Sequence, residues 1–449
     1  MGGEIAFRDI AQLVRDVVHP DDVGDVPYIG LEHIDQDTLR LNGWGHASDV
    51  HSAKFRFRRG DILFGKLRPY FRKVIRAPFD GICSTDIWVV RTKEGFDQGY
   101  LYYWMASQDF VDFASTGAEG TRMPRAKWEH VERFTRPYLP TSEQRAIAHI
   151  LGTLDDKIEL NRRMNETLEA VAQALFKSWF VDFDPVVVNA LKAGNPIPDK
   201  FAERAAWYGC TAVRPDSTLS LPEDILRLFP DRFQDSELGP IPEGWEIVPL
   251  PEIADIVLGG TPKTSVEEYW NGKIPWASAK DISAVSEPFI FETERSITEA
   301  GLNNSNAKLL PAGTTVITSR GTVGKHCILG RDMAINQTNY GLVPKPQVNK
   351  YFLYFVIVHL VQELKQRSYG TIFSTITTRT LKSITTFSPP LSVMETFSVL
   401  VSPPMDKIIH QICETQTLAN LRDTLLPKLI SGELRVPDVE KIREDGRYT

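Results

Sequence analysis

The densest group of chemically active side chains is a basic stretch from Lys54 to Arg76, in which aromatic residues are interspersed. Its nine lysines and arginines are opposed by a single acid, Asp61. A concentrated positive stretch is typical of phosphate binding, even in a chain whose net charge is −7. The alternative is an amphipathic hairpin, since Lys54 to Arg58 alternates basic and aromatic residues and its basic face could simply be solvated. We favour phosphate binding.

A glycine-rich turn from Ser319 to Lys325 comes close to the phosphate-binding loop of nucleotide enzymes. It lacks the first glycine at the required spacing, and His326 stands where serine or threonine would hold magnesium. The sequence also has no Gly-x-Gly-x-x-Gly run and no Asn-Pro-Pro-aromatic motif of amino-methyltransferases. The four cysteines are isolated and form neither a zinc pattern nor a disulfide framework. We therefore expect no catalytic residue, cofactor or metal ion on this chain.

The composition is that of a globular protein, with 42% hydrophobic and 24% charged residues in 449. The longest apolar stretches, such as residues 351–360, are far shorter than the roughly 20 residues needed to span a bilayer. The first residues lack the basic and apolar regions of a signal peptide. We expect a cytoplasmic protein with no membrane partner.

The chain repeats itself once. The run Val26 to Ile34 reappears as Ile274 to Ile282, and Asp156-Lys157-Ile158 reappears as Asp406-Lys407-Ile408. The offsets drift between about 248 and 253 residues, as expected for two copies whose loops have gained and lost residues. This period indicates a duplicated globular domain followed by a duplicated helix. Further matched pairs are Gly60 with Gly313, Leu101-Tyr102-Tyr103 with Leu353-Tyr354-Phe355, and Leu168 with Leu418.

Two long helices are predicted from apolar residues spaced three and four apart. The first covers Ser142 to Phe180 and would be about 58 Å long if helical throughout. The second follows a similar pattern from Ile408 to Leu429. Because prolines break the helical hydrogen-bond ladder, Pro403-Pro404 predicts that the second long helix begins near Met405, after a shorter helix over about residues 393–401.

Two helices of similar length in a duplicated chain can pack antiparallel, with one globular copy at each end. Three polar residues near their apolar seams, Asn161, Asn165 and Thr415, could fix the register. Residues 185–239 would then form the return connection, and their prolines and acids indicate an irregular linker with brief helical turns.

The predicted fold class is α+β, with an internal pseudo-two-fold repeat and an antiparallel helical pair, or coiled coil, between two similar domains. The mixed pattern of short strands, turns and helices supports this for both copies. The expected segments are a first domain at 1–140, a long helix at 141–184, a linker at 185–239, a second domain at 240–390, a C-terminal helix at 391–436 and a tail at 437–449.

Three motifs carry a resemblance to a known family. They are Phe176 to Pro185 (FKSWFVDFDP), Ile241 to Trp245 (IPEGW) and Leu425 to Leu434 (LLPKLISGEL). Together they strongly resemble the DNA specificity subunit of type I restriction-modification enzymes, over essentially the whole chain. Pro403-Pro404 departs from the continuous distal helix of that family.

The resemblance implies a non-catalytic subunit that recognises double-stranded DNA. Each target recognition domain would read one half of a bipartite asymmetric site, and the helices would set the gap between the halves. Expected partners are two methyltransferase (modification) subunits and restriction/translocase subunits, which would bind S-adenosylmethionine, ATP and Mg. The residues expected to contribute to partner binding are Phe176, Trp179, Phe180, Leu426 and Leu429.

Charge and position in the sequence suggest which loops would contact DNA. Arginine can pair with a guanine edge, whereas hydroxyl groups and backbone amides position phosphates. In the first copy the candidates are Lys66, Arg68, Tyr70, Arg72, Lys73, Arg122, Arg125 and Lys127, and in the second they are Ser319, Arg320, Thr322, Lys325, Thr371 and Ser374. The two sets differ, which suggests that the copies read different sequences.

Two other classes of function stay open at this point. A coiled-coil scaffold or adaptor without DNA specificity would account for the helices, but not for the matched mixed domains with basic turns. A self-sufficient nuclease would need clustered carboxylates, which the sequence does not reveal. Binding to duplex DNA would exclude the first class, and activity of the purified chain would favour the second.

Overall fold

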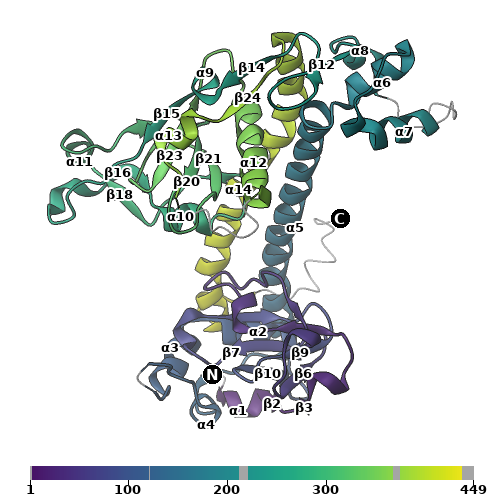
Figure 1. The fold of residues 1–449 in the computed structure, drawn as a ribbon. Coiled ribbons are helices and arrows are strands. Elements are labelled where there is room, and N and C mark those ends of the chain that lie inside the picture. The colour runs from purple at the N-terminus through teal and green to yellow at the C-terminus, as the bar shows by residue number, and fades with distance from the viewer. Residues whose placement is uncertain (1–2, 121, 212–220, 368–374, 437–449) are drawn as a thin grey trace. The chain divides into compact units, whose positions relative to one another are not determined.

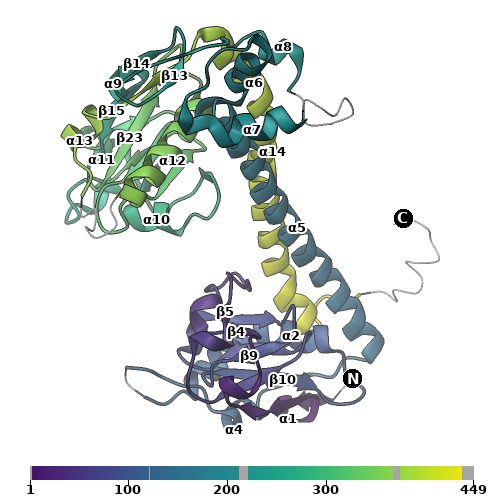
Figure 2. The ribbon, with the colours of Figure 1, turned by 45° about the vertical axis from the view of Figure 1, so that its right-hand side comes forward.

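The computed structural model describes residues 3–120, 122–211, 221–367 and 375–436. It divides into two compact units (Figures 1 and 2). Unit 1 contains residues 1–160 and 414–449, and unit 2 contains residues 161–413. Each unit therefore includes one mixed domain and parts of both long helices.

Unit 1 is built on two β-sheets, drawn in purple and blue in Figure 1. The first sheet is antiparallel, in the order β2 (Ala11–Val14), β10 (Ile87–Thr92), β7 (Ile62–Gly65) and β8 (Val74–Arg76). The second has the order β3 (Val17–Val18), β6 (Lys54–Phe57), β9 (Gly81–Cys83), β4 (Pro27–Ile29) and β5 (Gly45–His46). In this second sheet β4 and β9 are parallel.

The unit 1 domain also contains a further strand pair and several short helices. Two terminal strands, β1 (Glu4–Ala6) and β11 (Thr135–Pro137), pair with each other. The α-helices are α1 (Phe7–Ile10), α2 (Gln98–Ala106), α3 (Gln108–Thr116) and α4 (Trp128–Val131), and the short 3₁₀ helices are η1 (Pro20–Asp22), η2 (Leu31–His33), η3 (Ala47–Asp49) and η4 (Pro69–Phe71). Aromatic residues from the helices and from β7, including Trp104, Phe110 and Phe64, form a core with Leu426 and Leu429.

The domain of unit 2 has corresponding elements. Its first sheet has the order β15 (Ala254–Leu258), β23 (Asn339–Pro344), β20 (Thr315–Thr318), β21 (His326–Leu329) and β17 (Phe289–Ile290), and its second has the order β18 (Arg295–Ile297), β16 (Trp270–Ala277), β22 (Met333–Ile335) and β19 (Leu309–Leu310). The terminal strands β14 (Glu246–Pro249) and β24 (Thr385–Ser388) pair. The helices are α9 (Leu250–Ile253), η6 (Glu267–Tyr269), α10 (Ala279–Ala284), α11 (Glu299–Asn303), α12 (Lys350–Arg367) and α13 (Thr378–Lys382).

The predicted duplication and the α+β class are confirmed by strand order. The series β2-β10-β7-β8 in unit 1 corresponds to β15-β23-β20-β21 in unit 2. The parallel pair β4–β9 likewise corresponds to the parallel pair β16–β22. Gly60 and Gly313 occupy the same turn before β7 and β20, and both have a φ of 89°. Glycine adopts this φ without the steric cost that a Cβ atom would bring.

The long helices are α5 (Thr141–Phe180) and α14 (Leu391–Ile430), each of 40 residues. In unit 1, Arg422 Nη1 donates to Asp155 Oδ1 at 2.9 Å. The Lys157 ammonium lies 3.4 Å from the Glu414 carboxylate. Residue numbers therefore rise along α5 as they fall along α14, so the pair is antiparallel in this unit.

The same helices are also antiparallel in unit 2. Gln411 Nε2 lies 3.5 Å from Asn161 Oδ1. Further along the pair, the rings of Phe180 and Phe397 lie 5.0 Å apart. Asn161 and Asn165 are buried, and the Asn165 amide donates to Glu287 Oε1 at 3.2 Å. Buried polar groups of this kind favour one register, because another would leave them without partners.

Pro403 and Pro404 lie inside α14 and do not divide it, so the prediction of a separate helix from Met405 is wrong. The prolines remove the amide donors that would reach the carbonyls of Val399 and Leu400. Val399 is 72% exposed and Leu400 44%, so this turn of α14 lies at the surface. Burial of nearby side chains in the unit 2 core offsets the lost bonds, at roughly 1.5–3 kcal/mol for each. These side chains belong to Val401, Met405 and Ile408.

The segment expected as an irregular linker is largely folded. It contains α6 (Asp184–Ala193), η5 (Asp199–Phe201), α7 (Ala202–Thr211), α8 (Glu223–Leu226) and β12 (Phe233–Gln234). β12 pairs with β13 (Ile241–Pro242), at the start of the next domain. Val186, Phe201 and Phe229 belong to the hydrophobic core of unit 2. The expected helical turns are present, but the prolines and acids gave no sign that several apolar residues of the segment are buried in this core.

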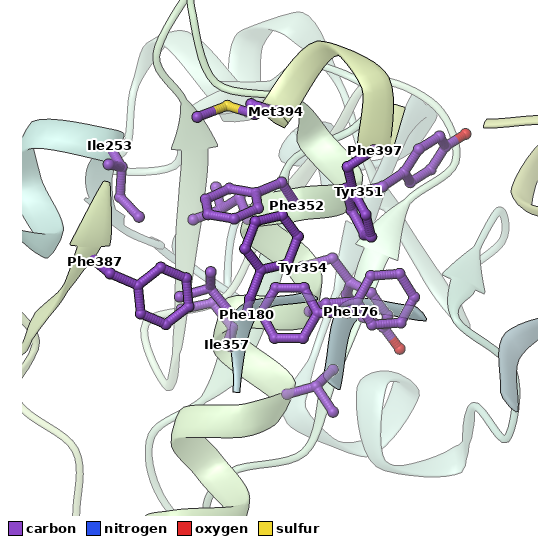
Figure 3. Packing of buried hydrophobic residues seen from close by; sticks show 14 of the residues in the cluster. Phe176, Phe180, Ile253, Tyr351, Phe352, Tyr354, Ile357, Phe387, Met394 and Phe397 are labelled. Carbon is purple, nitrogen blue, oxygen red and sulfur yellow. The ribbon is translucent and has the colours of Figure 1, made fainter. Parts of the chain in front are cut away.

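The predicted partner-binding side chains are internal. Phe176 and Phe180 point into the unit 2 core toward Phe352 and Phe397, as Figure 3 shows. Trp179 belongs to the same core, and Leu426 and Leu429 belong to the core of unit 1. A direct role of these five side chains in partner binding is therefore not supported, because their apolar surface already packs within the chain. Their position instead joins the ends of the helices to the two domains.

Candidate nucleic-acid interface

Three loops of unit 1 meet at one junction. They are the β7–β8 loop (residues 66–73), the β9–β10 loop (84–86) and the segment between α3 and α4 (117–127). The backbone amide of Lys66 donates to Asp86 O at 2.9 Å, and the amide of Ala126 donates to Lys66 O at 2.9 Å. The structure thus brings together the two segments that the sequence analysis proposed as separate DNA contacts in the first copy.

The same junction occurs in unit 2. The amide of Ser319 donates to Thr338 O at 2.8 Å, and the amide of Ile376 donates to Ser319 O at 2.9 Å. Ser319 therefore corresponds to Lys66, and Thr338 to Asp86. The predicted contacts Thr371 and Ser374 precede Ile376 and lie outside the described residues.

The β7–β8 loop presents basic and aromatic groups to solvent. Tyr70 is 50% exposed, and its ring lies 4.7 Å from that of Phe71. The Arg68 guanidinium lies 5.9 Å from the centroid of Phe71, and its Nη2 is 3.4 Å from Arg122 O. Arg122 is exposed, and Lys66 is half-buried. These groups can donate hydrogen bonds to phosphates or base edges and can stack on a base.

The backbone of this loop is held in an unusual conformation. Arg68 and Arg72 flank η4 and have φ values of 52° and 47°. The left-handed conformation costs a residue with a Cβ atom roughly 1–2 kcal/mol. Hydrogen bonds across the junction oppose this cost, among them that from the Arg68 amide to Pro124 O at 2.7 Å. Such conformations cluster at functional sites, where surrounding structure maintains them.

Two of the predicted cations are already paired. Arg125 donates from Nε and Nη2 to the two carboxylate oxygens of Asp86, at 2.9 and 3.2 Å, and this hydrogen bonding raises the pKa of Arg125. Lys127 forms an ion pair with Glu119. Both basic side chains remain partly exposed, so they can contact DNA only in competition with these carboxylates.

Arg72 and Lys73 were predicted to contact DNA, but their side chains bond within the protein and do not face solvent. The Arg72 side chain is 10% exposed and its Nε donates to Ala106 O at 2.7 Å. Lys73 Nζ donates to Leu31 O at 2.6 Å, and partial burial lowers the pKa of this ammonium. Their inward orientation does not support DNA contact by either side chain. A basic residue within a loop gives no local signal of which way it points.

The corresponding loop of unit 2 offers fewer charges. Ser319 is buried, and its hydroxyl donates to Thr338 O at 2.8 Å, so this side chain is not available to DNA. Arg320, Thr322 and Lys325 are exposed. The Thr322 hydroxyl contacts that of Ser283 in α10. This loop therefore presents two cations and a hydroxyl group, in place of the aromatic and basic set of unit 1.

Arg295 is a candidate contact that the sequence analysis missed. It is exposed, and its guanidinium carbon lies 3.5 Å from the ring centroid of Trp270 and 5.8 Å from that of Trp276. The indole nitrogen of Trp276 donates to Gly260 O at 2.9 Å, which fixes the ring. Stacking restrains the guanidinium and leaves its edge free to donate. Residues on β16 and β18 create this arrangement, so no sequence spacing could reveal it.

The described residues contain no group of three or more His, Cys, Asp or Glu side chains placed to hold a metal ion. Cys83 and Cys327 are buried free thiols, and burial raises the pKa of both, that of Cys327 to about 12. None of the helices in the described ranges is long and apolar enough to cross a membrane. The chemistry offered at the two junctions is hydrogen-bond donation and stacking.

Comparison with known proteins links this architecture to one family. The model of the type I restriction modification DNA specificity domain matches residues 16–170 and again residues 242–412. Each match begins in one mixed domain and extends into the long helix that follows it. The HindI specificity subunit of Haemophilus influenzae, a type I restriction enzyme subunit, is 27% identical over 407 residues, which are 85% of this chain and 88% of that protein.

Two further similarities agree with this match. The type I restriction enzyme MjaIX specificity subunit of Methanocaldococcus jannaschii is 26% identical over 353 residues, covering 77% of this chain and 71% of that protein. The crystal structure of a type I restriction-modification system S subunit from M. genitalium has a TM-score of 0.52 at 15% identity and covers 96% of both chains. The latter similarity is one of fold.

Proposed function

This chain belongs to the type I restriction modification DNA specificity family, and from that premise we propose that its two domains each read one half of a bipartite asymmetric DNA site. The chain is the non-catalytic specificity subunit of a restriction-modification system. Membership also argues against the scaffold and nuclease alternatives. The proposal concerns how recognition is divided between the two copies.

The observation that carries the proposal is the repeated loop junction with different side chains. Lys66 and Ser319 make equivalent backbone hydrogen bonds in the two domains. The surrounding residues are half-buried Arg68 and exposed Tyr70 and Arg122 in one domain, and exposed Arg320, Thr322 and Lys325 in the other. The same scaffold with different hydrogen-bonding groups suits the recognition of two different base sequences.

The partners and cofactors follow from the same family. We propose that two methyltransferase subunits bind this chain, and that restriction/translocase subunits join them. S-adenosylmethionine, ATP and Mg would be bound by those subunits. Because Phe176, Trp179, Phe180, Leu426 and Leu429 are internal, contacts to partners would involve the surfaces around them and not these side chains.

The antiparallel helices would set the gap between the half-sites. An insertion in only one of the two helices would displace the contact between Asn161 and Gln411. The test therefore inserts four residues into α5 beside Asn161 and four into α14 beside Gln411. Each insertion adds one helical turn, about 6 Å. This should lengthen the unread gap by one or two base pairs at 3.4 Å each and leave both half-sites unchanged. An active variant with the original gap would contradict this role.

The principal experiment expresses the chain with its methyltransferase subunits and maps methylated adenines across a genome. We expect a bipartite asymmetric sequence whose half-site centres lie about one helical turn, roughly 10 bp, apart. The purified chain alone should neither methylate nor cut DNA. A continuous palindrome in the map, or methyl transfer by the isolated chain supplied with S-adenosylmethionine, would contradict the proposal.

A further inference from the structure

Arg72 ends the exposed part of the β7–β8 loop and points into unit 1. Its Nε donates to Ala106 O, at the C-terminus of α2, and its Nη2 lies 3.8 Å from Asp423 Oδ1 of α14. A helix C-terminus carries partial negative charge, so both partners favour a cation at this position. The loop that carries Arg68 and Tyr70 is thereby attached to the helical part of the unit.

The contacts continue from Asp423 through the helical pair. Arg422 Nη2 lies 3.0 Å from Asp423 Oδ1, and its Nη1 donates to Asp155 Oδ1 of α5 at 2.9 Å. Tyr103 of α2 donates its hydroxyl to Asp155 Oδ2 at 2.6 Å. Two guanidinium groups and two carboxylates therefore alternate along one path, and their formal charges cancel. We call these five residues, Arg72, Asp423, Arg422, Asp155 and Tyr103, the anchor network.

The two arginines of the anchor network have little contact with water. Burial acts to lower the pKa of Arg72, and Asp423 opposes it. Burial also acts to lower the pKa of Arg422, but Asp155 and Asp423 outweigh it and raise the value. A buried guanidinium that loses its carboxylate is left with an uncompensated charge, which is costly. Asp423 is itself 47% exposed, so the ion pair and the hydrogen bond to Ala106 O together favour the inward orientation of Arg72 and, with it, one conformation of the loop end.

The corresponding loop of unit 2 is held in another way. The Thr318 hydroxyl donates to Thr322 O and accepts from the Lys325 amide at 3.0 Å, so the loop is closed by its own hydrogen bonds. Lys325, near the end of that loop, is exposed. No described residue of this loop makes an ion pair with α5 or α14. The two domains thus differ in how their equivalent loops are fixed.

We propose that Arg72 is a positioning residue that fixes the recognition loop of the first domain through Asp423 and Arg422, so that reading of one half-site alone depends on charged residues of the helical pair. This inference rests on the proposed function, in which each domain reads one half-site. It assigns Arg72 no contact with DNA. It also gives Asp423, a helix residue distant from the loop in sequence, an effect on base discrimination.

The test uses the complete complex with its methyltransferase subunits. The half-site read by the first domain is first identified by exchanging residues 1–140 for those of a relative. The variants Asp423→Asn and Arg72→Lys are then compared with Glu414→Gln, a matched control on the same helix. Glu414 pairs with Lys157 outside the anchor network, so loss of its charge controls for a general effect on the helical pair.

We expect Asp423→Asn and Arg72→Lys each to lower discrimination against wrong bases in the first half-site about tenfold, within the range of a single base contact. Discrimination in the second half-site should be unchanged, and Glu414→Gln should alter neither. The slope of log affinity against log salt concentration should stay the same, because Arg72 contacts no phosphate. The double variant should lose less than the product of the two single effects, since both changes interrupt one network.

Several results would overturn the inference. A salt slope reduced by about one in Arg72→Gln, which removes the charge that lysine keeps, would make Arg72 a direct phosphate contact. Equal losses of discrimination in both half-sites would indicate a role in folding only. A fall in thermal stability with unaltered discrimination would indicate the same. Unaltered discrimination in Asp423→Asn would show that α14 does not influence the recognition loop. If the parent complex methylates no bipartite site, the proposed function itself fails before any variant is compared.

Discussion

Arg125 and Asp86 form an ion pair with two hydrogen bonds that joins two loops of the unit 1 junction. The two nitrogen–oxygen distances are 2.9 and 3.2 Å, and both side chains remain partly exposed. Thr338 replaces the acid in the equivalent junction of unit 2, so that domain has no counterpart of the pair. In the first domain a carboxylate would therefore compete with DNA for Arg125, one of the predicted cations.

Substitution of this acid tests that competition. Asp86→Ala should release Arg125 and strengthen binding to duplexes of unrelated sequence, while the salt slope becomes steeper by about one phosphate contact. Fluorescence anisotropy with a labelled duplex at several salt concentrations measures both quantities. Glu94→Ala removes one exposed negative charge at the other end of β10 and serves as the control. An identical gain in that variant would show that net charge alone is responsible.

The two junctions should act on different half-sites. Arg68→Ala should weaken recognition of one half-site and Arg320→Ala that of the other, each by about 1–3 kcal/mol if the side chain reaches a base. Methylation mapping of each variant complex shows which positions become tolerant. Weaker recognition of the same half-site in both variants would contradict the assignment of one half-site to each domain.

Arg295 should contribute to binding by the second domain. Arg295→Ala should reduce affinity, and Arg295→Lys should restore it only in part, because a lysine lacks the planar group that stacks on Trp270. Binding titrations with cognate duplex provide the measurement. Arg331→Ala, in the exposed turn between β21 and β22, controls for the lost charge. Equal effects of the two alanine variants would show that Arg295 contributes to binding only through its charge.

Glu169 should make the stability of unit 2 depend on pH. Burial raises the pKa of this carboxyl above its ordinary 4.5, against the hydrogen bond from Tyr354, and the nearby Glu287 and Glu166 raise it further. The folded state therefore holds the proton more tightly than the unfolded state, so stability falls as pH rises from about 4.5 through the raised folded value.

The substitution Glu169→Gln tests this dependence, because glutamine can still accept from Tyr354 but does not ionise. The melting temperature of the variant relative to the parent should be higher at pH 8 than at pH 4. Differential scanning calorimetry over this range measures it. A difference in melting temperature that does not change with pH would contradict the inference that ionised Glu169 destabilises unit 2.

Much of the architecture could be predicted because its signals are local. The apolar seams of α5 and α14 follow helical spacing, and each helix must bury such a seam against another element. The duplication is visible in matched turns such as Gly60 and Gly313, where backbone geometry restricts the residue type. The family resemblance rests on motifs at the helix ends, and both the family and the mixed fold are confirmed.

The candidate interface could be predicted only in part. The segments were found from their charge, and the structure joins those of unit 1 at one junction. The orientation of individual side chains was not predictable, as Arg72, Lys73 and Ser319 demonstrate. Arg295 was missed because its stacking partners come from a neighbouring strand.

The sequence by itself determined the repeat, the helical pair and the places where basic groups concentrate, since each depends on residue types at short spacing. Only the tertiary structure decided that α14 continues through Pro403 and Pro404, that Arg72 faces Asp423, and that Arg125 forms an ion pair with Asp86. The physical reason is the same in each case. Burial and ion pairing act between residues far apart in the chain, and at these positions they outweigh the local conformational preferences.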